Sequence, residues 1–357
     1  MDEIINNEQS VNSFLKEFYD ENYNDNILLF DNMQNIYNLI AFLYYNMQEL
    51  DIEYPNLREG QRTSIVEVEK IIDDFYKNLG IDFKFNEIIK DGTFNIIRTT
   101  YPKKANIREL THGNNNYYVI TEYFEDPKTK EKIIIYEGIH KTINVYNNTL
   151  ITDSIIWVHE ISHYRNQPPL FRGEVNDILT ELLAFTYELI YTDYLEQIGY
   201  EEEGKTFKIE VYKNLHTFIK KGYYIVRIFL LYFLLGEVSQ ENYKFLYKED
   251  KDYEYALKSF DIEIIRRKDK NFIFTILFYS VGIISIYNYV EYKKNPKFLE
   301  KIEKLNQKLM NNKISLEDAL KIIDIKFEQE SLDKVLEDIN IFREELIEKS
   351  KIKTKKH

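Results

Sequence analysis

The residues best placed to do chemistry are those of the run His159-Glu160-Ile161-Ser162-His163. If this run is helical, His159 and His163 lie one turn apart on the same face, where both imidazoles can bind one Zn²⁺ ion. Glu160 is rotated away from that face and borders the open coordination position, where it can take a proton from a zinc-bound water. The spacing therefore predicts a catalytic zinc site with three protein ligands and one open position.

Glu181 is the expected third ligand, and it follows His163 by 18 residues. It lies beside the apolar stripe of a helical pattern over residues 176–195, and a carboxylate there is costly to bury unless it is paired or metal-bound. One alternative is that Glu181 is a surface carboxylate and that Glu174 or Glu188 supplies the ligand. Glu188, two turns further on, could instead accept a hydrogen bond from a zinc-bound histidine or face solvent.

A helix is needed to present the two histidines on one face. The apolar run at residues 155–158 favours a helix start, and Asp153 or Ser154 could cap it. Pro168 and Pro169 should end the helix soon after the second histidine. The alternative is an exposed helix on which two histidines happen to stand one turn apart.

Short β-branched or aromatic runs indicate a small sheet before this helix, at residues 94–97, 117–121 and 132–136. Residues 126–129, Asp-Pro-Lys-Thr, predict a turn between the last two runs. We expect an edge strand of the sheet to lie along the zinc helix and to pair with the substrate backbone.

The chain therefore divides into three predicted parts. Residues 1–95 form an N-terminal helical region, 96–150 a small β-sheet and 151–357 a helical catalytic region that includes the C-terminal helices. A helix is predicted over 64–79, and the acidic run at 201–204 is interpreted as a loop.

Composition excludes several classes of function. The 357 residues carry 60 acidic and 47 basic side chains, and the net charge of −13 makes the chain a poor nucleic-acid binder. The absence of cysteine rules out a disulfide framework, and the acidic N-terminus is unlike a secretory signal, so we expect a cytoplasmic protein. The apolar stretches at 223–235 and 272–287 are too short to span a membrane and are predicted to be buried helices. The sequence does not indicate an oligomeric state.

Four stretches of the sequence resemble the oligoendopeptidase F and thimet oligopeptidase family of zinc metallopeptidases: residues 145–153, 180–195, 274–285 and 314–339. The second stretch is similar to the family segment that holds the third zinc ligand, which falls on Glu181, and Glu188 matches a further acidic position there. The third looks like the family's helix with a tyrosine and a glycine, here Tyr279 and Gly282.

The resemblance implies a mainly α-helical fold with a small β-sheet, of the zincin-like (gluzincin) metallopeptidase type, in which a helical domain forms a channel. It implies one Zn²⁺ per chain, peptide substrates and a hydrogen bond from Tyr279 to the oxyanion. Read from the residues alone, Tyr279 is also compatible with a core position in an apolar helix.

This sequence departs from the family at several places. Ser162 stands where the family usually has glycine, Asn166 where it usually has another histidine, and residues 266–272 lack the histidine that the family carries there. The chain is also shorter than typical members, so we expect the N-terminal roof over the channel to be reduced.

The leading hypothesis is a zinc-dependent peptidase that hydrolyses internal bonds of short peptides through a zinc-bound water activated by Glu160. One alternative is a protease with a single dedicated protein substrate, which a reduced roof would admit. Another is a catalytically impaired pseudo-peptidase that binds peptides or proteins. The missing family histidine favours the second alternative, and the intact Glu160 argues against it.

Overall fold

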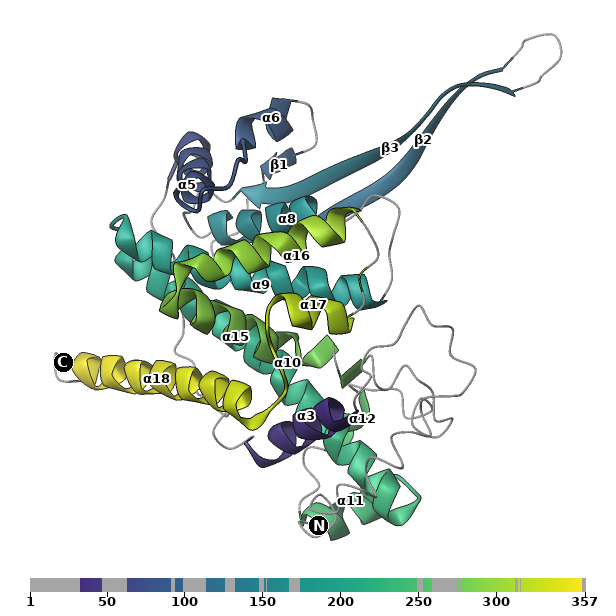
Figure 1. The fold of residues 1–357 in the computed structure, drawn as a ribbon, viewed down its shortest axis with the longest axis vertical. Coiled ribbons are helices and arrows are strands. Elements are labelled where there is room, and N and C mark those ends of the chain that lie inside the picture. Colours follow the sequence, from purple (N-terminus) through teal and green to yellow (C-terminus); the bar gives the residue numbers. More distant parts are fainter. Residues whose placement is uncertain are drawn as a thin grey trace.

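The structure is a computed structural model, shown in Figure 1. It describes residues 33–46, 63–90, 94–98, 114–125, 132–147, 151, 153–166, 174–248, 253–258, 275–276, 278–311, 314 and 316–354. The described part is mainly α-helical with one small sheet, as the sequence predicted. Residues 126–129 and 266–272, on which two of the expectations above depend, lie outside this part.

The elements run along the chain in the order helices, strands, helices. In the described part of the chain, the first three helices are α3 (Met33–Tyr45), α5 (Ile65–Asn78) and α6 (Phe85–Lys90), and the strands are β1 (Phe94–Arg98), β2 (Asn114–Glu125) and β3 (Lys132–Asn147). The later helices are α8 (Asp153–Asn166), α9 (Glu174–Gln197), α10 (Glu201–Leu235), α11 (Gln240–Tyr247), α12 (Tyr253–Lys258), α15 (Val281–Lys294), the 3-10 helix η2 (Pro296–Phe298), α16 (Leu299–Asn311), α17 (Leu316–Ile322) and α18 (Gln329–Thr354).

The sheet has the strand order β1-β3-β2. Strand β1 pairs parallel with the end of β3, with Phe94 opposite Ile143, and β2 pairs antiparallel with β3, with Tyr118 opposite His140. Strands β2 and β3 extend beyond the predicted runs and form a ribbon that projects from the helical body (Figure 1). Both strands contact α8, so the sheet lies along the helix that carries the two histidines.

Helix α8 is held by an apolar side that is fully buried. Trp157, Val158 and Ile161 have no exposed surface, and the helix ends at Asn166, just before the two prolines. Ser154 lies inside the first turn, where its hydroxyl donates to the carbonyl oxygen of Ile151 at 2.5 Å. Ser154 is therefore not the N-cap that the sequence suggested as one option, because a cap side chain accepts from the backbone.

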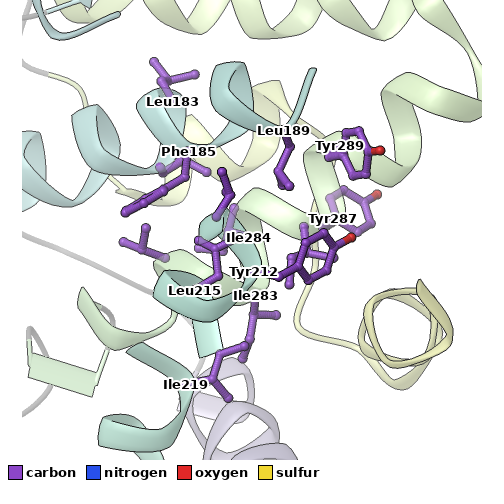
Figure 2. Packing of buried hydrophobic residues seen from close by; sticks show 14 of the residues in the cluster. Leu183, Phe185, Leu189, Tyr212, Leu215, Ile219, Ile283, Ile284, Tyr287 and Tyr289 are labelled. Carbon is purple, nitrogen blue, oxygen red and sulfur yellow. The ribbon is translucent and has the colours of Figure 1, made fainter. Parts of the chain in front are cut away.

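Helix α9 begins and ends close to its predicted limits. Its stripe of Ile178, Leu182, Phe185 and Leu189 is buried as predicted, and the helix packs against α8, α10 and α15. Figure 2 shows Phe185 and Leu189 of this stripe in the apolar core. The burial of α9 on several sides explains why its polar residues are also drawn into the interior.

Helix α10 begins earlier than expected. The acidic run at 201–204, interpreted from the sequence as a loop, forms its first turn, so that prediction was wrong. Carboxylates are favourable at this position because a helix N-terminus carries a partial positive charge. The connection from α9 is instead made by Gly199, whose φ of +99° is a conformation that favours glycine.

Helices α10 and α15 approach closely at Gly282. A Cβ atom there would lie 2.7 Å from the carbonyl oxygen of Leu215, so only glycine fits. Figure 2 shows Ile283 and Ile284 of α15 beside Leu215 of α10. Of the predicted helix over 274–285, the structure describes residues 275–276 and 278–285, and a turn at Ser280 separates Phe278 and Tyr279 from α15.

The apolar stretch at 223–235 forms the second half of α10, and the described residues of 272–287 belong to α15 and the segment before it. Among the helices that the structure describes, none is both long and apolar enough to cross a bilayer.

Candidate metal centre

Three predicted ligands, His159, His163 and Glu181, meet between α8 and α9. The Nε2 atoms of the two histidines lie 3.0 Å apart. The carboxylate oxygens of Glu181 lie 3.7 Å from Nε2 of His159 and 3.4 Å from Nε2 of His163. Among the described residues, these three side chains form the group that could hold a metal ion, and their donor atoms all lie within 4.8 Å of one another.

The separations between these donors match those around a tetrahedral zinc ion. Zinc binds imidazole nitrogen and carboxylate oxygen at about 2.0–2.1 Å, so two ligands on a tetrahedron stand about 3.3–3.4 Å apart. The observed distances of 3.0, 3.4 and 3.7 Å bracket that value. The three side chains could therefore hold a metal ion, and three protein ligands leave the fourth position open.

Glu188 contacts the imidazole of His159 at Nδ1, the ring nitrogen that does not face the other two donors. Its Oε1 lies 2.8 Å from Nδ1 of His159, and its side chain is only 5% exposed, so the solvent-facing alternative for Glu188 was wrong. A proton on Nδ1 that is shared with this carboxylate leaves the lone pair of Nε2 facing Glu181. Metal-binding histidines in proteins are commonly oriented by such a carboxylate.

The electrostatics of the site favour positive charge. Burial lowers the pKa of His159, but Glu188 and the carboxylates of Glu181 and Glu160 outweigh it and raise that pKa to about 10. Burial likewise raises the pKa of Glu181, but the two histidines, His163 first, lower it to about 2. Without a metal ion, His159 is therefore protonated at neutral pH and Glu181 is ionised.

Glu160, the predicted proton acceptor, is buried, with 7% of its surface exposed. It follows His159 directly on α8 and is therefore rotated by about 100° from the face that carries the histidines. The neighbouring aromatic ring of Phe185 lies 5.4 Å from the ring of His159, in a T-shaped arrangement.

Phe185 is a site residue that the sequence reasoning treated only as core. It lies four residues after Glu181 and three before Glu188, so all three share one face of α9. This shared face is the signal that could have identified Phe185. Its ring also contacts Phe218 of α10 at 5.7 Å, which extends the aromatic wall away from the histidines.

Tyr279, the predicted oxyanion donor, lies at the far end of this wall. It is half-buried just before α15, its ring is 6.2 Å from that of Phe218, and Lys221 Nζ is 5.9 Å from its ring centroid. The ring of Tyr279 therefore continues a series of ring contacts that runs from His159 through Phe185 and Phe218. The structure thus brings together the three predicted ligands, whereas the roles of Glu160 and Tyr279 stay predictions.

No family model and no curated protein matches this sequence. Among solved structures, the chain is similar to a candidate oligoendopeptidase F from Bacillus anthracis strain Ames, with 14% identity and a TM-score of 0.49. It is also similar to PZ peptidase A with an inhibitor, with 12% identity and a TM-score of 0.47. Both alignments cover 93% of this chain but only 58% and 60% of the other chains, so it spans less than two thirds of their length.

Proposed function

We propose that this protein is a zinc-dependent peptidase that hydrolyses internal bonds of short peptides. The observation that carries the proposal is the convergence of His159, His163 and Glu181 at tetrahedral spacing. Glu188 contacts the other ring nitrogen of His159, Nδ1. A purely structural cluster has no need of two imidazole nitrogens that face each other beside a carboxylate. The sequence resemblance over residues 180–195 and 274–285 supports peptides as the substrates.

His159, His163 and Glu181 would hold the zinc ion, which supplies Lewis acidity and makes a water molecule at its open position more acidic. Glu160 would accept a proton from the attacking water and deliver it to the leaving nitrogen of the scissile bond. Glu188 keeps the proton of His159 on Nδ1 throughout. Tyr279 is proposed to donate a hydrogen bond to the developing oxyanion.

The remaining expectations belong to the same proposal. One zinc ion per chain, the zincin-like fold with a channel, the division at residues 95 and 150, and a cytoplasmic location are each consistent with it. The resemblance over residues 140–345 supports the first two of these.

The proposal is tested by zinc content together with cleavage of a mixed library of quenched peptides. Wild type is compared with Glu160→Gln, and with Glu202→Gln as a matched control, because Glu202 is exposed on α10. We expect one zinc per chain in all three proteins and cleavage by wild type and the control alone. Zinc without cleavage in wild type would favour the peptide-binding alternative or a single protein substrate. A folded chain that binds no zinc would refute the proposal.

A further inference from the structure

The two helices that carry the metal donors are also joined on another side by a single carboxylate. Glu303 of α16 accepts a hydrogen bond from Arg165 of α8, with Nη2 2.6 Å from Oε2. Its other oxygen, Oε1, accepts a short hydrogen bond from the hydroxyl of Tyr187 of α9. Helix α16 contacts both α8 and α9, and in Figure 1 it runs alongside them.

This junction faces away from the metal donors. Arg165 follows His163 by two residues. Side chains two positions apart on a helix point in directions that differ by about 200°. Tyr187 follows Glu181 by six residues and is likewise turned to a different side of α9. The donor group and the Glu303 junction therefore act on the same pair of helices from different sides.

The junction is held rigidly. The guanidinium carbon of Arg165 lies 5.2 Å from the ring centroid of Tyr76 and 5.4 Å from that of Tyr187, so the cation contacts two aromatic rings. Both tyrosines have no exposed surface. Burial, above all, raises the pKa of Tyr187 well above its ordinary value, so the hydroxyl stays protonated and continues to donate.

We infer that Glu303 is a positioning residue for the proposed metal site, because it binds α8 through Arg165 and α9 through Tyr187. His159 and His163 come from α8, whereas Glu181 comes from α9, so a small sliding of one helix along the other changes the tetrahedral spacing. Glu303 opposes that sliding. This inference rests on the proposed function, since it gives the junction a role in binding zinc.

Substitution of Glu303 is feasible because the junction borders solvent. A cavity of about 760 Å³ is lined by Arg165, Glu303 and Asn306 among others, and the Glu303 side chain is 23% exposed. Water in this cavity can hydrate Arg165 when its partner is lost, which lessens the cost of an unpaired cation. Glu303→Gln is therefore expected to fold, with one charged hydrogen bond weakened.

A matched pair of tyrosine variants separates positioning from general loss of stability. Tyr187→Phe removes only the hydroxyl that binds Glu303. Tyr212→Phe removes an equivalent hydroxyl, which makes a short hydrogen bond to Asp338 and joins α10 to α18 instead of joining a donor helix to α16. Both variants lose one buried hydrogen bond to a carboxylate and keep their rings, so similar decreases in the melting temperature of the metal-free proteins are expected.

The experiment measures zinc dissociation constants by chelator competition, together with visible spectra of the Co²⁺-loaded proteins. We expect zinc binding to weaken by about 3- to 10-fold in Tyr187→Phe and about 10- to 100-fold in Glu303→Gln, with altered Co²⁺ bands. Tyr212→Phe should match wild type in both measurements. Equal effects of the two tyrosine variants, or no effect of Tyr187→Phe, would overturn the inference.

The outcomes separate this inference from the proposed function. If Glu303→Gln fails to fold, the tyrosine pair still decides. If wild type binds zinc and cleaves peptides while Tyr187→Phe binds zinc equally well, only the positioning role fails. If wild type binds zinc without cleaving, the peptidase proposal fails and the dissociation constants still test Glu303. If wild type binds no zinc, both fail.

Discussion

Carboxylates lie on two sides of the α8–α9 pair, and the two sides differ in the positive partner that each carboxylate has. On the side of the Glu303 junction, the carboxylate faces a cation that the chain itself supplies, the guanidinium of Arg165. On the donor side, Glu181 and Glu188 face imidazoles, which are neutral at neutral pH unless their surroundings raise the pKa. The carboxylate of the junction is paired with a cation of the protein itself, whereas the donor side gains from an added cation.

This difference indicates which side performs the chemistry. A carboxylate buried with its own arginine contributes to structure, so removing one partner costs stability and affects the metal donors only through the positions of α8 and α9. On the donor side, a positive charge arises only because the neighbouring carboxylates raise the pKa of His159 to about 10. A metal ion can replace the proton that His159 then carries. The comparison predicts that substitutions on the donor side change metal binding and turnover more than they change stability.

The largest effect is expected from Glu160→Gln. The amide cannot accept the proton of the attacking water, so kcat/KM for peptide cleavage should fall by at least about 10³-fold. The zinc content should be unchanged, because Glu160 is not among the three donors. Steady-state kinetics on the best library peptide measures the change. Cleavage within tenfold of the wild-type rate would remove Glu160 from the mechanism.

Loss of a donor should weaken zinc binding most. In Glu181→Ala the site keeps two imidazoles and loses its carboxylate, so the zinc dissociation constant should rise by more than about 100-fold. Circular dichroism should show unchanged helix content. If this variant binds zinc as tightly as wild type, another residue is the third ligand, and Glu174 would be the next one to substitute.

Substitution of the supporting carboxylate should have a smaller effect. Glu188→Gln still reaches Nδ1 of His159 but carries no charge, so zinc binding should weaken by about 10- to 100-fold. The same titration gives the value, and Glu202→Gln again serves as the exposed control. An unchanged dissociation constant would show that Glu188 stabilises the fold without acting on the metal site.

The smallest effect concerns the stability of the metal-free protein as a function of pH. The pKa of His159 is raised in the folded state from 6.5 to about 10, so its contribution is fully present below pH 6.5 and is lost as the pH rises towards 10. Urea unfolding between pH 6.5 and 10 should therefore show decreasing stability, and Glu188→Gln should flatten the decrease. Zinc binding should strengthen over the same interval, because protons compete with the metal for Nε2. A stability that rises with pH in wild type would contradict the assigned protonation.

The donor side could be predicted because its residues lie on two consecutive helices, where their spacing in the sequence shows which face they share. The spacing of His159 and His163 fixes a common face on a helix, and the stripe that ends near Leu189 identifies the next helix and the position of Glu181 on it. The two-turn spacing of Glu188 from Glu181 left its contact with His159 as one alternative beside a solvent-facing position, and only the structure distinguishes them. Helices α8 and α9 therefore appear where the pattern predicts them.

The junction was not predictable by the same route. Arg165 and Glu303 are 138 residues apart, and neither has a neighbour in the sequence that identifies its partner. The acidic run at 201–204 was taken for a loop because its glutamates lack an apolar period, although they form the first turn of α10. The break at Ser280 was missed because the residues on both sides are apolar and helical. Each of these three features depends on packing between segments, which a local sequence pattern does not reveal.

The central claim is most directly tested by X-ray absorption at the zinc edge of the reconstituted protein. The account predicts a first shell of nitrogen and oxygen at about 2.0–2.1 Å, with outer-shell scattering from two imidazoles. Replacing Glu181 by alanine should preserve the scattering of both imidazoles and change the oxygen contribution. Zinc bound with one imidazole or none would contradict the assignment of His159 and His163 as its ligands.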